Sequence, residues 1–541
     1  MSQILLQWRT RHFVACCVRA SLLALIVLSW QQGHAEELLA DIADYELIGN
    51  TLLTPVQTQQ ALAGATGKVT LAEIQKAAQR LQEAYRLAGY GAVVVHVPQQ
   101  TLGDRTVRLE VIEGKLSQIQ VAGIREFSRE NIIRSLPSLV LNQTPSLAAL
   151  DSELLMVNEN PAKSVRVVFQ PGEKKAQVEA LIVVQEQAIQ QWSLSLDNTG
   201  NDSTGQYRLS LAYQNANFRD SDSVLGLRFV TSPTDLSQVG ILSSTFRMPM
   251  YGQKTFWEWS ALASNTRNAP NQTPAGELRF SGEGFSVGGR SIWTLPSLSE
   301  YKQQASLGLE SRQYRNTCTL GTFGAAGCGT AAASVDVLPL TVGYTLQKPG
   351  MVNATVQWVS NLALGSAGDD NAFDVSRPGA VSRYRLLRAN AMSNMALTAD
   401  WALSWRMDVQ LAAQALVSAE QFGAGGSYSV RGYPERIVSG DSGALVSGEL
   451  STSLNQLLGA NVSTQSLQFS WFVDAATVRN RLDTACTTGQ STCTLWGTGA
   501  GLLWRSGKNT SARFALARAG ESINTIPSGD LRLHFSLTHQ F

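Results

Sequence analysis

Hydrophobic and polar residues alternate with two different periods along this chain, and the change of period divides it into two parts. Between residues 44 and 188, apolar residues recur at the three- and four-residue spacing of helices, with short apolar runs between these segments. From residue 190 to Phe541 the helical spacing disappears, and alternation of single apolar and polar residues predicts β-strands. We therefore expect an α+β part followed by an all-β part.

The first part contains an internal repeat. A strand signal ends at Gly49 and another at Gly123, and each is followed by two helix signals and two further strand signals. The later elements of the two copies keep the same offset of about 73 residues. The common order and offset predict two tandem β-α-α-β-β modules, residues 44–115 and 116–188.

The second part is predicted to form antiparallel strands with one apolar and one polar face. The clearest strand places these apolar residues on one side: Trp401, Leu403, Trp405, Met407, Val409 and Leu411. A soluble sandwich would bury this face, whereas a membrane barrel would turn it to lipid. The last strand ends at Phe541, and an amphipathic terminal strand that closes on an aromatic residue is typical of bacterial outer-membrane barrels. Connectors that alternate between short and long predict about sixteen strands over residues 190–541.

Composition favours the membrane barrel. Of the 541 residues only 16% are charged, against about 25% in soluble globular domains, whereas 44% are hydrophobic and the net charge is +1. Such values argue against a disordered chain and against a nucleic-acid binder, which usually carries a basic excess. The chain also lacks apolar runs of about 20 residues for spanning helices, which leaves a closed β-barrel as the structure that satisfies its backbone in a bilayer.

Residues 1–35 are expected to form a cleaved signal peptide. Basic residues precede the apolar run 20–30, and the small residues Gly33 and Ala35 suit a cleavage site. A membrane anchor would need a longer apolar span. Cleavage would place the mature chain beyond the cytoplasm, in an oxidising compartment.

Two closely spaced cysteine pairs remain after the expected cleavage, Cys318 with Cys328 and Cys486 with Cys493. Four cysteines allow three pairings, and the short loops favour the two local disulfides. Zinc is a poor alternative, because the spacing is not C-x-x-C and no histidine lies nearby.

Two serine motifs raise the alternative of a secreted hydrolase. Residues 284–288 match G-x-S-x-G, and residues 440–443 resemble the nucleophile loop of chymotrypsin-like proteases. The first motif lacks the helix that should follow it, and a triad also needs a histidine. The mature chain offers only His96, His534 and His539, of which the last two face opposite sides of one predicted strand. We expect no catalytic residue, no metal and no cofactor.

The most unusual connector is residues 418–443, which holds six glycines and the run Gly-Gly-Ser-Tyr-Ser-Val-Arg-Gly-Tyr at 425–433. Glycine permits tight folding of the backbone. In one interpretation Arg431 stays exposed on an outer loop. In the other, the loop folds into the barrel and Arg431 binds an inward-facing carboxylate, as a bidentate pair where the geometry allows.

Three acidic residues are candidates for that carboxylate. Asp474 lies on the inward face of its predicted strand together with Phe472, because the alternating residues between them face lipid. Glu449 and Asp408 also face inward and compete for Arg431. Spacing alone does not choose among them.

These features together resemble the two-partner secretion transporters, outer-membrane proteins that secrete and activate haemolysins and filamentous haemagglutinins. The modules resemble polypeptide-transport-associated (POTRA) domains, and the resemblance covers essentially the whole mature chain. The matching pieces are Gly89-Tyr90, residues 111–114, Asp197-Asn198-x-Gly200, the loop tip Val430, Arg431, Gly432 and Tyr433, and the terminal Phe541. The family implies that Arg431 contacts the aspartate of an inner-wall F-x-D-x-G motif. Residues 472–476 match this motif with Asp474, except that Ala476 replaces the glycine.

The resemblance implies a monomeric pore in the outer membrane that secretes one large partner exoprotein, with or without activating it. The modules would stand in the periplasm and capture the client's N-terminal secretion domain by strand addition, and the long loops would be extracellular. The barrel-assembly machinery would insert the protein into outer-membrane lipid. Many members carry an N-terminal plug helix, but about nine residues between Glu36 and Tyr45 cannot span a barrel. We therefore expect the inward loop to be the main closure of the pore.

Two other functions compete with secretion. An assembly factor for outer-membrane proteins would share the architecture but usually has more modules. A diffusion porin or receptor would need no modules.

Overall fold

The structure is a computed structural model that describes residues 40–541, apart from gaps at 102–103, 269–270, 275, 324, 327, 329–332, 365–366, 455–466, 483–484 and 488. The expected signal peptide, residues 1–35, lies outside these residues. The chain divides into two compact units. The first comprises the described residues up to Gln118 with Val140–Ala148 and Pro171–Glu179, and the second comprises Ile119–Leu139, Ala149–Gln170 and Ala180–Phe541.

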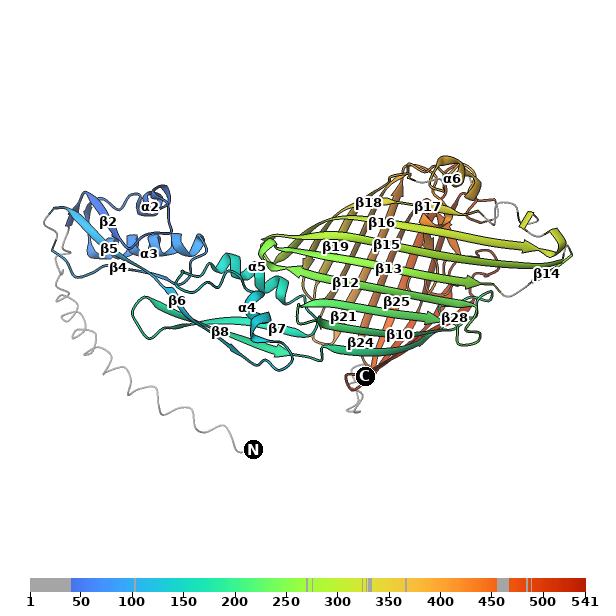
Figure 1. The fold of residues 1–541 in the computed structure, drawn as a ribbon, viewed down its shortest axis with the longest axis horizontal. Helices are drawn as coiled ribbons and strands as arrows, with labels where there is room; N and C mark the ends of the chain where they lie inside the picture. Colours follow the sequence, from blue (N-terminus) through green and yellow to red (C-terminus); the bar gives the residue numbers. More distant parts are fainter. Residues whose placement is uncertain are drawn as a thin grey trace, which may run out of the picture. The chain divides into compact units, whose positions relative to one another are not determined.

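The first module consists of β1 (Ala40–Ile42), β2 (Asp44–Ile48), α2 (Pro55–Leu62), β3 (Gly67–Val69), α3 (Leu71–Leu87), β4 (Val93–His96) and β5 (Thr106–Glu113). Strands β2, β5 and β4 form one sheet in this order, with β2 parallel to β5 (Figure 1). Helix α3 begins at a capping box between Thr70 and Glu73 and buries Ile74, Leu81 and Tyr85 in the core. The two-stranded sheet of β1 and β3 was not predicted, because three-residue strands are too short to show an alternation.

The second set of module elements is β6 (Lys115–Ala122), α4 (Arg129–Arg134), α5 (Leu147–Val157), β7 (Lys163–Pro171) and β8 (Gln177–Glu186). Its sheet has the order β6-β8-β7. The repeat extends to a glutamate at the end of the last strand in each module. Glu113 accepts hydrogen bonds from the backbone of Thr51 and Leu52 after the first strand, and Glu186 accepts them from Arg125, Glu126 and Phe127.

Sixteen long strands form a closed antiparallel barrel within the described part of the chain, in sequence order around the ring (Figure 1). They are β9 (Gln190–Asp197), β10 (Arg208–Phe218), β11 (Ser223–Thr231), β12 (Val239–Met250), β13 (Thr255–Arg267), β15 (Gly276–Leu298), β16 (Tyr301–Leu320), β18 (Pro339–Lys348), β19 (Val352–Asn361), β20 (Arg385–Ala396), β21 (Trp401–Ala412), β24 (Ser442–Ser453), β25 (Leu467–Arg479), β26 (Thr492–Ser506), β27 (Thr510–Ala519) and β28 (Leu531–Gln540). The ring also contains two three-residue strands, β14 (Asn271–Thr273) and β17 (Val335–Val337). The predicted fold class and strand number are therefore confirmed.

The last strand closes the barrel against the first. Residues Ser536 to Gln540 of β28 pair with Asp197 to Ser193 of β9, and the backbone N–H of Phe541 donates to the carbonyl of Trp192. Beyond Asp197 a side chain continues the pairing. Asn198 donates from Nδ2 to the carbonyl of Leu533 (2.7 Å) and accepts at Oδ1 from the N–H of Phe535 (2.9 Å), as a neighbouring peptide group would.

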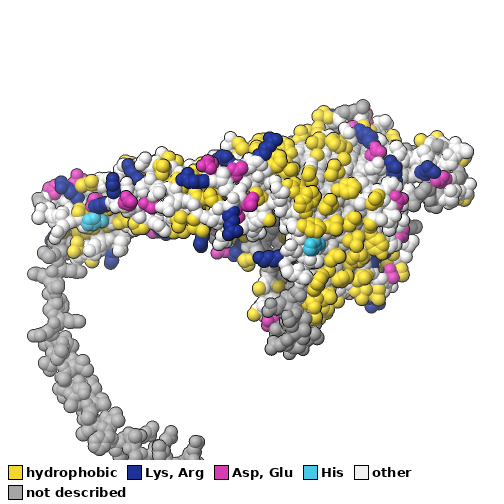
Figure 2. Space-filling model, turned by 60° about the horizontal axis from the view of Figure 1, so that its bottom comes forward, with side chains coloured by type: hydrophobic (Ala, Val, Ile, Leu, Met, Phe, Trp, Pro, Cys, Tyr) yellow, Lys and Arg dark blue, Asp and Glu magenta, His cyan; other side chains and the backbone are white. Residues whose placement is uncertain are grey.

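The outer face of the barrel is apolar. Trp257, Phe285 and Leu533 are 40%, 49% and 50% exposed, which would be costly in water for so many large side chains. Figure 2 shows hydrophobic side chains gathered over the barrel strands. Among the described residues, no helix is long and apolar enough to cross a membrane.

A buried polar cluster in the second unit ties β7 to the turn between β10 and β11. The ammonium of Lys163 contacts both carboxylate oxygens of Asp222 at 2.7 Å, and both side chains are almost completely buried. The Lys163 ammonium also donates to the side-chain oxygen of Asn131 at 3.0 Å. The Tyr251 hydroxyl donates to Oδ2 of Asp222 at 2.7 Å. Burial lowers the pKa of Lys163, and the charge of Asp222 opposes this shift.

Candidate functional site: the tip of the inward loop

The candidate site is formed by the connector between β21 and β24, residues 413–441, which we call the inward loop. Its short strands β22 (Phe422–Ala424) and β23 (Val438–Gly440) pair with each other, and its tip packs against inward-facing side chains of the barrel. Strand β25 shows why these side chains point inward. Trp471 and Val473 are 42% and 57% exposed on the outer face, whereas Phe472 and Asp474 between them are buried.

Arg431 binds two carboxylates of the barrel wall. Its Nε and Nη2 donate to the two oxygens of Asp474 at 2.7 and 2.9 Å, a bidentate pair, and its backbone N–H donates to Asp474 at 3.1 Å. Nη1 donates to Glu449 at 2.8 Å. Of the competing acids, Glu449 therefore joins Asp474, and Asp408 instead pairs with Arg406.

The site compensates for burying these charges. Asp474 is fully buried, and a fourth hydrogen bond comes from the hydroxyl of Ser447 at 2.7 Å. The Arg431 guanidinium also lies over the ring of Phe472, 3.4 Å from its centroid. A buried ion pair is tolerated when further hydrogen bonds satisfy its atoms, as they do here.

Two glycines allow the loop tip to approach the wall. Gly432 has φ +98°, a conformation that favours glycine, and its N–H donates to Nε2 of His534 at 3.1 Å. Gly497 in β26 lies against the Arg431 backbone, so that a Cβ there would be 2.0 Å from the Arg431 carbonyl oxygen. Any side chain at residue 497 would therefore push the tip away.

The other tip residues pack into an apolar cluster. Val430 and Tyr433 are fully buried, together with Ala476, Cys493 and Leu495. The methyl group of Ala476, where the family motif has glycine, takes part in this packing. The Tyr433 hydroxyl accepts the backbone N–H of Glu521 at 2.8 Å and lies 3.1 Å from the Trp496 carbonyl.

The structure thus brings together all the residues proposed for the inward loop and its wall, namely Val430, Arg431, Gly432, Tyr433, Phe472 and Asp474. Sequence reasoning missed the roles of His534, Ser447 and Gly497. Because His534 lies between Leu533 and Phe535 on an amphipathic strand, the sequence indicated that its side chain points inward. The sequence did not indicate that this side chain would contact Gly432.

Two further buried carboxylates hold the stem of the inward loop through ion pairs. Glu420 is paired with Arg312 (2.7 Å) and Arg388 (3.3 Å) of the barrel wall. Asp441 is paired with Arg377 (2.6 Å), which follows the short helix α6 (Asp370–Ser376). None of these three ion pairs was predicted.

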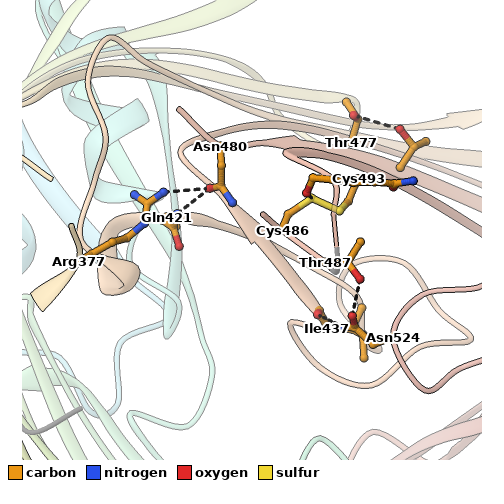
Figure 3. Close-up of a disulfide and its surroundings, with 11 residues drawn as sticks. Arg377, Gln421, Ile437, Thr477, Asn480, Cys486, Thr487, Cys493 and Asn524 are labelled. Atoms are coloured by element: carbon orange, nitrogen blue, oxygen red, sulfur yellow. Dashed lines mark hydrogen bonds between the residues drawn. A yellow bond between two sulfur atoms is a disulfide. The ribbon is translucent and has the colours of Figure 1, made fainter. Parts of the chain in front are cut away.

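Both predicted local disulfides are present, Cys318–Cys328 and Cys486–Cys493. The second lies beside the inward loop (Figure 3). Neither serine motif lies in the surroundings that a hydrolase would need. Residues 284–288 lie inside β15, without a following helix, and the Ser442 hydroxyl accepts the N–H of Ala412.

Comparisons with known proteins agree with this architecture. Residues 40–114 match the POTRA domain, ShlB-type, and residues 179–503 match the haemolysin secretion/activation protein family ShlB/FhaC/HecB. The outer membrane transporter CdiB of Dickeya dadantii is 24% identical over 72% of this chain and 67% of its own. The heme/hemopexin transporter protein HuxB of Haemophilus influenzae is 23% identical over 30% of this chain, and the match spans only 29% of that relative.

Solved structures show the same fold. CdiB from Escherichia coli superposes with a TM-score of 0.79 at 18% identity, covering 94% of this chain and 92% of that one. CdiB from Acinetobacter baumannii gives a TM-score of 0.70 at 16% identity, covering 93% and 90%. Because the family model matches more than half of the chain, this protein belongs to the haemolysin secretion/activation family ShlB/FhaC/HecB, the outer-membrane transporters of two-partner secretion.

Proposed function

We propose that this protein secretes one large partner exoprotein through its barrel, and that the inward loop closes the lumen at rest. The observation that carries the proposal is the buried Arg431–Asp474 pair, in which three hydrogen bonds from Arg431 to one carboxylate fix the loop tip inside a transmembrane barrel. A tip held in this way would block passage until it is released, and no chemical step is needed for transport.

The modules would stand in the periplasm and capture the client. In the first module, the sheet order β2-β5-β4 leaves β2 and β4 as edge strands that could accept an extended segment of the client's N-terminal secretion domain. The long connectors, including both disulfides, would face the outside. The apolar outer face suits outer-membrane lipid, into which the barrel-assembly machinery would insert a monomer.

The related transporters support a polypeptide client. The family to which this chain belongs is described as haemolysin secretion/activation proteins, and among similar proteins HuxB is named as a heme/hemopexin transporter and CdiB as an outer membrane transporter. The energy would come from folding of the client outside the cell, because ATP is absent from the periplasm. The client's identity, and whether activation accompanies secretion, would follow from the exoprotein gene next to that of the transporter.

Conductance tests the closing role of the loop. The purified full-length protein should form small, mostly closed channels in planar bilayers. Deletion of residues 430–433 should raise the conductance, because it removes Arg431 and the buried tip residues. An unchanged conductance of the folded deletion variant would refute the loop as the closure.

A further inference from the structure

The Cys486–Cys493 disulfide joins the β25–β26 connector, residues 480–491, to the beginning of β26, because Cys486 lies in the connector and Cys493 in the strand. Cys493 is 1% exposed and belongs to the apolar cluster that contains Val430 and Tyr433 of the loop tip. Cys486 packs against the same cluster. The bond therefore borders the inward loop, and Figure 3 draws it together with Ile437 of this loop.

Hydrogen bonds link the same connector to the inward loop through a third segment. Thr487, next to Cys486, donates from its hydroxyl to Oδ1 of Asn524 at 2.6 Å. Asn524, in the β27–β28 connector, donates from Nδ2 to the carbonyl of Ile437 in the inward loop at 3.2 Å. Thr487, the neighbour of Cys486, is thus connected to Ile437 through Asn524 (Figure 3).

The start of the β25–β26 connector holds the stem of the inward loop. Asn480 accepts hydrogen bonds from Gln421 (2.9 Å) and Arg377 (3.3 Å), and the N–H of Arg481 donates to Asp441 (2.8 Å). The connector therefore contacts the stem at one end and the tip cluster at the other.

The second disulfide offers a comparison. Cys318 lies near the C-terminal end of β16 and forms a disulfide with Cys328 in the following connector. Among the described residues, neither of these cysteines belongs to the cluster around Val430 and Tyr433. A general stabilising effect of extracellular disulfides would be common to both bonds, whereas an effect on the inward loop would belong to one.

We propose that the Cys486–Cys493 disulfide is a positioning element of the inward loop and that its oxidised form favours the closed lumen. The proposal rests on the proposed closing role of this loop. Closing the seven-residue separation restricts the connector, so Thr487 and Cys493 stay where Asn524 and the tip cluster need them. Without the bond, the connector gains conformational freedom and the inward loop loses two of its supports.

The test compares two double variants of the full-length protein, Cys486→Ser/Cys493→Ser and Cys318→Ser/Cys328→Ser. Hydrogen exchange of the amides at 424–433 measures the freedom of the loop tip directly. We expect exchange about tenfold faster in the first variant and unchanged in the second. Equal exchange in the two variants would overturn the proposal.

Asn524→Asp keeps the test decisive if the first double variant folds poorly. The aspartate retains an acceptor for Thr487 but loses the donor to Ile437, so it weakens the same connection with the disulfide intact. It should also speed exchange at 424–433, and wild-type exchange would count against the proposal. Open probability in bilayers separates this inference from the proposed function. Faster exchange without more frequent opening would leave the positioning of the loop by the disulfide intact, but it would refute the loop as the closure and with it the effect of the disulfide on the lumen.

Discussion

Asp474→Asn tests the buried pair that holds the loop tip. The substitution keeps the size of the side chain but removes the charge opposite Arg431, and it places an NH2 group against N–H donors of Arg431 or against the Ser447 hydroxyl. Removing one partner of a buried ion pair costs about 3–5 kcal/mol. Because Glu449 still binds Arg431, we expect the lower end of this range, about 3 kcal/mol.

This cost should fall on the closed state, in which the pair is formed. A loss of about 3 kcal/mol shifts the ratio of released to bound tips by about a hundredfold, since 1.4 kcal/mol is a factor of ten. Single-channel recordings of the purified protein should therefore show a large increase in open probability. Combining Asp474→Asn with Arg431→Met should add little to either single change, because both remove the same interaction.

Glu258→Gln is the matched control. Glu258 is also an acid of the barrel wall, but it pairs with Arg290 on the neighbouring strand at 2.5 Å rather than with the loop. This variant should keep the wild-type open probability. If Asp474→Asn and Glu258→Gln give the same recordings, the Arg431–Asp474 pair does not hold the pore closed.

Three further predictions concern the close contact between Gly497 and the Arg431 backbone, the buried Lys163–Asp222 pair, and the seam between β9 and β28. Gly497→Ala should raise the open probability of the channel without changing any charge, because the added Cβ would meet the Arg431 carbonyl. Gly448→Ala is the control, since a Cβ at residue 448 would have open space, and it should keep the wild-type open probability. Equal open probabilities of the two variants would contradict this geometry. Lys163→Met should lower the free energy of unfolding by about 3–5 kcal/mol, since Asp222 is left buried without its cation, and Lys163→Met/Asp222→Leu should recover most of it. Urea unfolding in detergent followed by tryptophan fluorescence measures both, and a double variant as unstable as the single one would refute the account. Asn198→Ala should lower the temperature at which the barrel unfolds on heating in SDS gels, because it removes two hydrogen bonds across the β9–β28 seam, and an unchanged temperature would show that they contribute nothing.

Much of the fold could be predicted from the sequence because strand alternation is a local signal. Trp471 and Val473 alternate with Phe472 and Asp474, so the apolar face and the inward acids follow from neighbouring positions alone. The glycine-rich run 425–433 likewise indicated a tightly folded loop. Short strands such as β1 and β3 carry too few residues to show a period.

The rest of the site depends on contacts between distant segments. Gly432 meets His534, and Arg431 meets Gly497, across strands that the chain reaches much later. The sharing of Arg431 between Asp474 and Glu449 depends on the adjacent positions of β24 and β25, where Glu449 lies opposite Phe472. The spacing of residues in the sequence does not determine which inward-facing acid the loop tip will bind.

Secretion of a partner is the most direct test of the central claim. A strain that lacks this transporter is supplied with the wild-type protein or an empty vector, together with the exoprotein encoded beside its gene. The account predicts exoprotein in the medium with the wild-type protein and its retention in the periplasm with the empty vector. Export to the medium at the same level without the transporter would contradict it.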